Sequence, residues 1–494
     1  MSEPRQFIPG RVPTPPVIDP QGERTLAGWL ERGIELDAQG RVNEAILAFQ
    51  QGLESYPKAV PLWSNLGLCL RKEGRLSEAI TALEYAVAGK PDASYAWLNL
   101  ATVCGAAGVT ERALQSAERV VAIAPGKSTS WGVYGNCLRD AGRIEEAIRA
   151  YDKGLQIEPA HPSLRWNQSE TLLLGEQWAR GFEQYEWRYR RPGYFPAWWG
   201  RKLWRGRKLS GTLLLHTEQG FGDAIQFARF VREARERVGC IVVRCHRRLA
   251  HFFRGVEGVD RVVTKEEPLP PCDRQCFVMS LPALLQLEGV PAEPARVVLP
   301  GGTVPLALRN RVKPGQIRVG VAWQGNPKFG RDHLRSIPLQ AYAPFAKVAG
   351  VQLFSLQKHH GREQIAECGF QIHDLDSELD GGSHAFVDTA AAIQNLDCLI
   401  VSDSSLAHLA GSMGCKVLLL IPKSPDWRWG LSSTTSSWYP SMRLFRQTRM
   451  GDWSEPVETI THVLEALVFR SRWGGVHERN RPVRDGLVGV CGNA

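Results

Sequence analysis

The sequence predicts the fold class α + α/β, an N-terminal α-solenoid followed by a module of two α/β halves. Two observations lead to this prediction. Alanines recur at a spacing of 34 residues over residues 45–147. Beyond them, short apolar runs alternate with amphipathic stretches, and the alternation begins again after a segment rich in proline and glycine at residues 300–315. The first pattern indicates stacked helical repeats, and the second indicates parallel sheets that are covered by helices.

The helical repeats span residues 26–159. Around each recurrent alanine, a tryptophan lies 16 residues earlier, a small residue follows that tryptophan by four, and a proline closes the unit. The recurrent positions are Ala45, Ala79, Ala113 and Ala147; Trp29, Trp63, Trp97 and Trp131; Gly33, Gly67, Ala101 and Gly135; and Pro57, Pro91, Pro125 and Pro159. This period with these residue types is the signature of tetratricopeptide repeats. We expect the small residues to let paired helices approach closely, the tryptophans to fill the gap between units, and the prolines to end the second helices.

A degenerate fifth unit at residues 164–189 is expected to cap the stack. Its aromatic residues are Trp166, Trp178, Tyr185 and Trp187. They would also suit a sugar platform, but buried capping contacts are the favoured interpretation. Stacked repeats form a concave groove for extended ligands, so we expect them to hold a protein or peptide segment.

The composition of the chain excludes several classes of protein. No apolar run approaches the roughly 20 residues of a membrane span, and the proline-rich start has no apolar core of a secretory signal. We therefore expect a cytoplasmic protein without an integral membrane segment. The 11 cysteines are scattered, and the spacing of Cys272 and Cys276 fits no zinc pattern, so free thiols and no metal are expected. The net charge of +9 comes without a nucleic-acid motif, which favours anionic small molecules over nucleic acid.

After residue 189 the chain reads as two successive α/β halves. Strands are predicted at residues 212–216, 240–244, 261–263 and 277–279, and then at 317–323, 351–356, 398–401 and 416–421. Helices are predicted between them, for example at 223–238 and 388–396. The predicted organisation is a disordered leader (1–22), the repeat array with its capping helices (23–190), a linker (191–209), a first half (210–305), a second half (316–470) and a basic tail (471–494). Parallel sheets bind ligands at the carboxyl ends of their strands, so a cleft between the halves is the expected site.

The first candidate motif is the turn after the opening strand, which reads His-Thr-Glu-Gln-Gly-Phe-Gly-Asp at residues 216–223. Gly220 and Gly222, next to Gln219, are expected to let the backbone turn tightly and approach a ligand. Asp223 then begins a helix. It is interpreted either as a helix cap, which the spacing alone favours, or as a general base that faces the cleft.

The second candidate motif follows the strand predicted at residues 398–401. Asp403 ends that strand, Ser404 and Ser405 open a helix, and His408 lies on the helix. Free amides at such a helix start, assisted by the serine hydroxyls, can hold a phosphate or pyrophosphate. An ordinary helix cap with a hydrogen-bonded core histidine is an equally good interpretation of these residue types.

The third candidate is the loop at residues 323–335, which leaves the first strand of the second half. Its basic residues Lys328, Arg331 and Arg335 can neutralise a leaving diphosphate, although most such clusters are solvated basic loops. A fourth segment, Asp-Trp-Arg-Trp at residues 426–429, is interpreted either as a surface that stacks on a base or sugar or as a packed aromatic corner.

At these motifs the chain resembles bacterial tetratricopeptide proteins fused to a family 9 glycosyltransferase-like module, the family of the lipopolysaccharide heptosyltransferases. The matching segments are Glu-Gln-Gly-Phe-Gly-Asp at 218–223, Asp-Thr-Ala-Ala-Ala-Ile at 388–393, Ser-Asp-Ser-Ser-Leu-Ala-His-Leu-Ala-Gly at 402–411, Pro-Asp-Trp-Arg-Trp at 425–429 and Trp-Tyr-Pro-Ser-Met-Arg-Leu-Phe-Arg at 438–446. They span most of residues 165–468. The likeness to the heptosyltransferases themselves is confined to the glycine-aspartate turn and the 403–408 segment.

The resemblance implies a GT-B fold of two Rossmann-like halves, with the acceptor on the first half and the nucleotide-sugar on the second. It implies an inverting transfer that needs no bound metal or cofactor, with the nucleotide-sugar as co-substrate. Asp223 matches the family's catalytic aspartate, and Asp403, Ser404, Ser405 and His408 match its donor-binding segment. The basic residue of the family's loop corresponds to Lys328 or Arg331. The heptosyltransferases have a threonine-glycine pair where this chain has two serines, so the donor stays unassigned.

The leading hypothesis from the sequence is therefore a glycosyltransferase whose repeats present a protein or envelope-precursor acceptor. The main alternative is a scaffold in which the repeats bind a partner and the second module is inactive or binds only a nucleotide. A nucleocytoplasmic protein O-glycosyltransferase of the GlcNAc type also follows repeats, but the two matching segments favour family 9.

Overall fold

A computed structural model of the chain describes residues 25–191, 202–291, 293, 297–299, 302–309, 313, 315–329, 332–381 and 385–473. The predicted leader, most of the predicted linker and nearly all of the predicted basic tail lie outside these residues. The chain divides into two compact units, Met1–Cys137 and Leu138–Ala494. The division falls within helix α7 (Ser128–Asp140), well before the predicted end of the repeat array at residue 190. The last repeat helices thus belong to the same unit as the α/β module.

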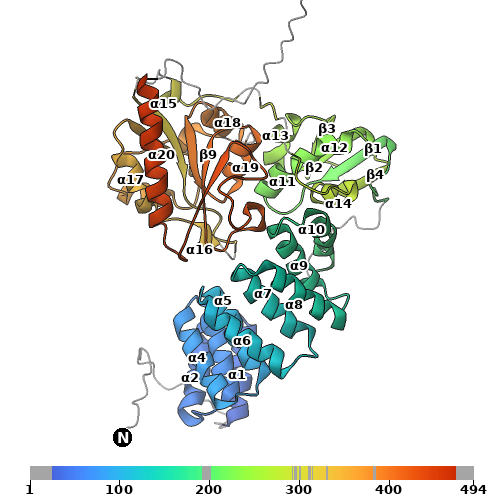
Figure 1. The fold of residues 1–494 in the computed structure, drawn as a ribbon, viewed down its shortest axis with the longest axis vertical. Helices are drawn as coiled ribbons and strands as arrows, with labels where there is room; N and C mark the ends of the chain where they lie inside the picture. Colours follow the sequence, from blue (N-terminus) through green and yellow to red (C-terminus); the bar gives the residue numbers. More distant parts are fainter. Residues whose placement is uncertain are drawn as a thin grey trace, which may run out of the picture. The chain divides into compact units, whose positions relative to one another are not determined.

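The first unit consists of paired antiparallel helices (Figure 1). They are α1 (Leu26–Ala38), α2 (Val42–Ser55), α3 (Val60–Lys72), α4 (Leu76–Gly89), α5 (Ser94–Ala106), α6 (Thr110–Ile123) and most of α7. The second helix of each pair ends two residues before the recurrent proline, for example at Ser55 before Pro57 and at Gly89 before Pro91. The residue before a proline is restricted to extended backbone, which explains why the prolines mark these ends as predicted.

Small residues bring the paired helices together, as the sequence predicts. A Cβ atom at Gly33 would lie 2.2 Å from Cε1 of Phe49, and one at Gly67 would lie 2.6 Å from Cγ of Leu83. Ala45 and Ala79 are fully buried on the facing helices. Any larger residue at the glycines would push the two helices of the pair apart.

The recurrent tryptophans fix the joints between units by a hydrogen bond that the sequence did not suggest. Three of the four indole N–H groups donate to the carbonyl of the proline six residues earlier: Trp63 to Pro57 (2.8 Å), Trp97 to Pro91 (2.9 Å) and Trp131 to Pro125 (2.8 Å). The proline closes one unit and the tryptophan belongs to the first helix of the next. The pair therefore joins consecutive repeats as well as filling space between them.

The second unit begins with the remaining repeat helices and a short 3₁₀ segment. These are α8 (Ile144–Ile157), α9 (Pro162–Leu174), α10 (Trp178–Tyr185) and η1 (Glu186–Arg190). Aromatic residues of α10 pack on the α/β module: Trp178 on Trp438, Phe182 on Phe230 and Tyr185 on Trp427, with ring centroids about 6 Å apart in each pair. Phe182 and Tyr185 are buried, so these aromatics form a core and not a sugar platform.

In the part of the chain that the structure describes, the first sheet of the module has four parallel strands in the order β3-β2-β1-β4. The strands are β1 (Leu209–His216), β2 (Val238–Cys245), β3 (Arg261–Thr264) and β4 (Arg274–Phe277). The strand predicted at residues 277–279 lies earlier, at Arg274–Phe277, because the chain forms a 3₁₀ segment from Val278 onward. The helix predicted at residues 223–238 was also wrong in extent. It is divided into α11 (Phe221–Phe227), η2 (Ala228–Phe230) and α12 (Val231–Arg235).

The second sheet has six parallel strands among the described residues, in the order β10-β9-β8-β5-β6-β7 (Figure 1). They are β5 (Ile317–Ala322), β6 (Val351–Ser355), β7 (His373–Asp374), β8 (Cys398–Ser402), β9 (Val417–Ile421) and β10 (Met442–Arg446). Its principal helices are α17 (Ala343–Lys347), α18 (Val387–Gln394), α19 (Ser405–Ser412) and α20 (Ser454–Trp473). The predicted parallel α/β content after the repeats is confirmed, although β7 and β10 were not predicted. In the described part of the chain, no helix combines the length and apolarity needed to cross a bilayer.

Candidate functional site

The two candidate motifs occupy equivalent places in the two sheets. Helix α11 begins at Phe221, directly after the turn that leaves β1, and α19 begins at Ser405, directly after β8. Both helix starts therefore lie at the carboxyl end of a central strand, the edge at which parallel α/β sheets bind ligands.

The starts of α11 and α19 contact each other through Gly222. A Cβ atom there would lie 2.9 Å from Cδ2 of His408 and 3.5 Å from the Cα atom of Ser405. Neither Gly220 nor Gly222 has a positive φ, so the turn does not use the left-handed conformation that glycine favours. Gly220 has an ordinary φ of −81°, and the left-handed residue is Gln219, with φ of 55°. Gly222 is needed because there is no room for a side chain between the two helices.

Asp223 makes two hydrogen bonds, one with its own turn and one with the second half of the module. Its Oδ2 atom accepts from the backbone N–H of Gly220 at 2.9 Å, which is the cap interaction. Its Oδ1 atom accepts from Nη2 of Arg428, which comes from the second half. Burial raises the pKa of Asp223, whereas the charge of Arg428 and the Gly220 N–H oppose that rise. The carboxylate is thus a helix cap and at the same time faces the other half of the module.

Arg428 is the residue of this site that the sequence reasoning missed. It lies in η8 (Trp427–Trp429), is 9% exposed, and donates to Asp223, to Oε1 of Gln226 and to Oδ1 of Asp426 at 2.7 Å. The two tryptophans beside it are 4% and 2% exposed, so this segment is a packed aromatic corner. The sequence Trp-Arg-Trp at residues 427–429 is a signal that could have identified Arg428, because an arginine buried between two tryptophans needs an anionic partner.

His408 is held in the core. It is 4% exposed, its Nδ1 atom lies 3.0 Å from the hydroxyl of Tyr439, and its ring stacks on Trp429 at a centroid distance of 5.3 Å. Burial lowers the pKa of His408 to about 3, with a further contribution from the charge of Arg428. The imidazole is therefore neutral near pH 7. Of the two interpretations left open, the hydrogen-bonded core histidine describes its contacts.

Asp403 lies between opposing charges at the end of β8. Burial raises its pKa to about 6, and the charge of Asp426 adds to the rise, whereas Arg335 and Arg428 oppose it. Ser404 is the N-cap residue of α19, but its side chain makes no capping hydrogen bond. Its Oγ atom is buried without a hydrogen-bond partner among the described residues, and Ser405 forms the first turn of the helix.

Among the loop residues that the structure describes, Arg335 brings a positive charge to this region. Arg335 is 20% exposed and forms an ion pair with Asp332, with 3.0 Å between Nε and Oδ1. Its positive charge acts to lower the pKa values of Asp403 and His408. Lys328 is exposed, and its backbone N–H donates to Oδ1 of Asn326. The prediction for Arg331 falls on a residue outside the described part of the chain.

A buried charge cluster ties the last repeat segment to the Asp223 turn. Arg188 of η1 is 1% exposed, and its Nη2 atom donates to Oε1 of Glu218 at 2.7 Å and to Oγ of Ser280 at 2.8 Å. Tyr189 donates to Oε1 of Glu218 at 3.0 Å. No pattern in the sequence pairs these residues, because Arg188 and Glu218 are 30 positions apart in different predicted domains.

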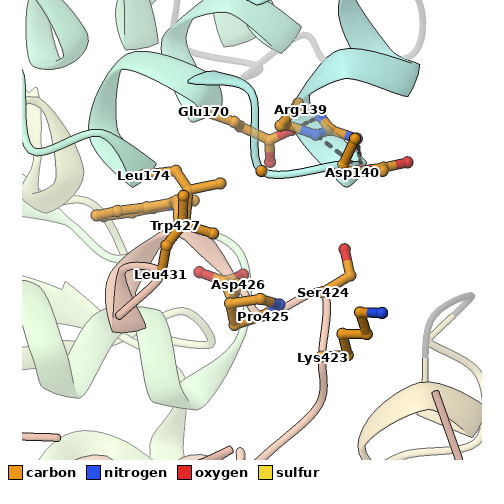
Figure 2. Close-up of a pocket in the computed structure, with 12 residues that line it drawn as sticks. Arg139, Asp140, Glu170, Leu174, Lys423, Ser424, Pro425, Asp426, Trp427 and Leu431 are labelled. Atoms are coloured by element: carbon orange, nitrogen blue, oxygen red, sulfur yellow. Dashed lines mark hydrogen bonds and ion pairs between the residues drawn. The ribbon is translucent and has the colours of Figure 1, made fainter. Parts of the chain in front are cut away.

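A groove of about 140 Å³ lies beside this site (Figure 2). One lip comes from repeat helices and one from the loop after β9. The lining residues are Arg139, Asp140, Ala141, Gly142, Glu170, Leu174, Lys423, Ser424, Pro425, Asp426, Trp427 and Leu431. None of the predicted donor-binding residues within the described ranges lines it. Among the described residues, no group of His, Cys, Asp and Glu side chains is arranged to hold a metal ion.

Comparison with known proteins identifies the first part of the chain. The tetratricopeptide repeat family matches residues 30–94, 70–128 and 98–163. The N-terminal region consists of tetratricopeptide repeats. Protein FlbA of Caulobacter vibrioides is 28% identical over 302 residues, which cover 53% of this chain and 48% of that protein. The chain thus spans about half the length of this curated relative, and the similarity is longer than the span matched by the repeat family.

Solved structures similar to this chain cover about a third of it. The tetratricopeptide protein TTC0263 of Thermus thermophilus is 19% identical with a TM-score of 0.31, and covers 34% of this chain and 92% of its own. YrrB, described as a tetratricopeptide protein with an unusual peptide-binding site, is 17% identical with a TM-score of 0.30, and covers 35% and 90%. MamA is 18% identical with a TM-score of 0.30, and covers 33% and 90%.

Proposed function

We propose that this protein is a glycosyltransferase with a GT-B fold, in which the repeats recruit a protein or envelope-precursor acceptor. It transfers a sugar from a nucleotide-sugar with inversion and without a bound metal. The observation that carries the proposal is the contact between the starts of α11 and α19 at Gly222 and His408. Two helix starts from two separate parallel sheets meet there, an arrangement suited to hold a donor and an acceptor against each other.

In this proposal Asp223 is the general base. Its pKa is raised by burial, which favours proton acceptance closer to neutral pH. The acceptor hydroxyl gives its proton to the carboxylate while its oxygen attacks the anomeric carbon from the side opposite the leaving diphosphate. Bond formation to the acceptor and cleavage of the bond to the diphosphate then invert the anomeric centre.

The cations near α19 are proposed to hold the leaving nucleoside diphosphate. Arg428 and Arg335 both act on the charge of Asp403, and the free amides at the start of α19 add a partial positive charge. The Ser404 hydroxyl, buried without a described partner, supports a phosphate contact at this helix start. A diphosphate here competes with Asp223 for Arg428, so donor binding would release the carboxylate for its role as base.

The alternative is a scaffold whose second module binds a nucleotide without transfer. The ion pair between Asp223 and Arg428 favours it, because a carboxylate neutralised by a buried guanidinium is a poor base. The tetratricopeptide matches, which concern protein recruitment and no chemistry, are equally compatible with it.

Donor binding and donor turnover separate the two functions. The full chain is heated with UDP-, GDP-, ADP- and dTDP-sugars, because a bound ligand raises the melting temperature by mass action. We expect one nucleotide to stabilise the protein by several degrees, and Asp223→Asn to keep that shift while abolishing hydrolysis or transfer of the sugar.

Asp260→Asn is the matched control, since Asp260 also accepts a backbone N–H, that of Ile241 at 2.7 Å, but does so in the middle of β2. A shift without turnover in the wild type would favour the scaffold. The absence of a shift with every nucleotide-sugar would contradict the proposal.

A further inference from the structure

The groove of Figure 2 has two chemically different lips over an apolar floor. Leu174 and Trp427 are buried and form the floor, and Leu431 is 37% exposed at the edge. The repeat lip carries Arg139, Asp140 and Glu170, and the module lip carries Lys423 and Asp426 (Figure 2). A groove with an apolar floor and polar edges suits an extended chain better than a compact polar ligand.

The repeat lip has an excess of negative charge. Arg139 lies between two carboxylates, with 3.1 Å from Nη2 to Oδ1 of Asp140 and 3.9 Å from Nη1 to Oε2 of Glu170. Both carboxylates are about 30% exposed, whereas the guanidinium is 17% exposed. A ligand therefore meets carboxylates first along this lip, and a basic side chain is favoured there.

The module lip presents the opposite charge. Lys423 is exposed and forms no ion pair with any residue that the structure describes. The carboxylate of Asp426 already pairs with Arg428 at 2.7 Å. The ammonium group of Lys423 is thus the charge that this lip offers to a ligand, and it favours an acidic side chain.

The guanidinium group of Arg428 connects the groove to the carboxylate of Asp223, the proposed base, by hydrogen bonds. Arg428 bonds to Asp426, which lines the groove, and to Asp223, the proposed base. A chain that lies in the groove is therefore linked to Asp223 through the hydrogen bonds of Arg428. Nucleotide-sugars would bind poorly in the groove itself, because their diphosphate would face Asp140, Glu170 and Asp426.

We infer that the groove binds an extended polypeptide, the segment of the acceptor that flanks the modified residue, with a basic side chain toward Glu170 and an acidic one toward Lys423. The assignment of this segment as acceptor rests on the proposed function. Binding of the polypeptide does not, because the groove is formed whether or not sugar is transferred.

The inference is tested by reversing charges in the groove and measuring binding to an array of peptides, each about 15 residues long. The peptides contain a central serine or threonine and carry Lys or Glu at each flanking position in turn, and the purified full chain is applied without donor. We expect Glu170→Lys to lose about fivefold in apparent affinity for peptides with a lysine at one flank. Lys423→Glu should lose a similar factor for peptides with a glutamate at the other flank. Glu183→Lys, an exposed charge change on α10 outside the groove, should bind like the wild type.

The pattern across peptides decides the outcome. Each groove variant must change its preference at one flank and gain affinity for the opposite charge there, which a folding defect would not produce. Loss of binding that is uniform across all peptides, or a pattern equal to that of the wild type, would overturn the inference. Charge-selective peptide binding, together with no turnover in the nucleotide-sugar assay, would support the groove and reject the transferase, so the two failures are distinguishable.

Discussion

The repeat helices and the α/β module are stabilised by contacts of very different sequence separation. In the first unit, Gly67 packs on Leu83 of the next helix, and Trp97 bonds to Pro91 six residues away. In the module, Arg428 bonds to Asp223, 205 residues away, and Arg229 bonds to the carbonyl of Trp438, 209 residues away. A destabilising substitution in the repeats should therefore weaken only neighbouring helices, whereas one in the module should weaken elements that are distant in the sequence.

The largest effect is expected from Arg188→Met, which removes the cation of the buried cluster. Glu218 would remain buried without its charge partner, so the free energy of unfolding should fall by about 3–5 kcal/mol. Chemical denaturation followed by hydrogen exchange should show the loss in residues 138–473 and leave residues 25–137 protected. Arg190→Met, an exposed change on the same segment, is the control. Equal loss of protection in both units would contradict the comparison.

A smaller effect is expected from Asp403→Asn, and it should depend on pH. The folded pKa of about 6 lies above the ordinary value of 3.8, so the folded state binds more protons than the unfolded state between these values. The stability due to this group is present below pH 3.8 and is lost as the pH rises through 6. The variant should therefore be more stable than the wild type at pH 7, by up to about 3 kcal/mol, and equal to it near pH 4. Thermal melts across this range measure the difference, and a gain that is constant with pH would contradict the assignment.

Gly67→Ala should destabilise the repeats by about 1–3 kcal/mol, because its Cβ would lie 2.6 Å from Leu83. Gly105→Ala is the matched control, since a Cβ at that helical glycine meets no atom within 4 Å. That control should stabilise the helix by about 0.5–1 kcal/mol. Urea denaturation of the two variants gives opposite signs if close helix approach explains the recurrent small residues, and the same sign if it does not.

The smallest effect is expected from Trp97→Phe, which removes the donor to the Pro91 carbonyl. A hydrogen bond of this kind contributes about 1 kcal/mol. Trp29→Phe should cost less, because the indole N–H of Trp29 has no partner among the described residues. Urea denaturation measures both, and an equal loss in the two variants would show that ring packing and not the hydrogen bond joins the units.

The sequence predicted the repeats well because their contacts are periodic. A glycine or alanine at the same place in each unit reports a close approach, and a proline reports a helix end. In the module, β1, β2, β3, β5, β6, β8 and β9 were recognised from apolar runs. The edge strand β10 (Met442–Arg446) was missed because arginines interrupt its short apolar run. Strand β7 was missed because it has only two residues.

The candidate site was predicted only as separate motifs. The turn that contains Asp223 and the segment that contains His408 were both recognised, but their contact at Gly222 depends on the packing of two sheets. The partners that set the protonation of these residues were not recognised. Arg428 acts on Asp223, Asp403 and His408 together, and no spacing in the sequence connects it to any of them.

The sequence by itself therefore determined the repeat array, the order of the two α/β halves and the residue types at the helix starts. These features are encoded by local periodicity and by turn chemistry, which act within a few tens of residues. Tertiary structure alone decided that the last repeat segment is bonded to the Asp223 turn, that Arg428 holds Asp223, and that a groove forms between α9 and the loop after β9. Such contacts depend on how buried charges find partners across the fold, because desolvation makes an unpaired charge costly wherever it lies in the chain.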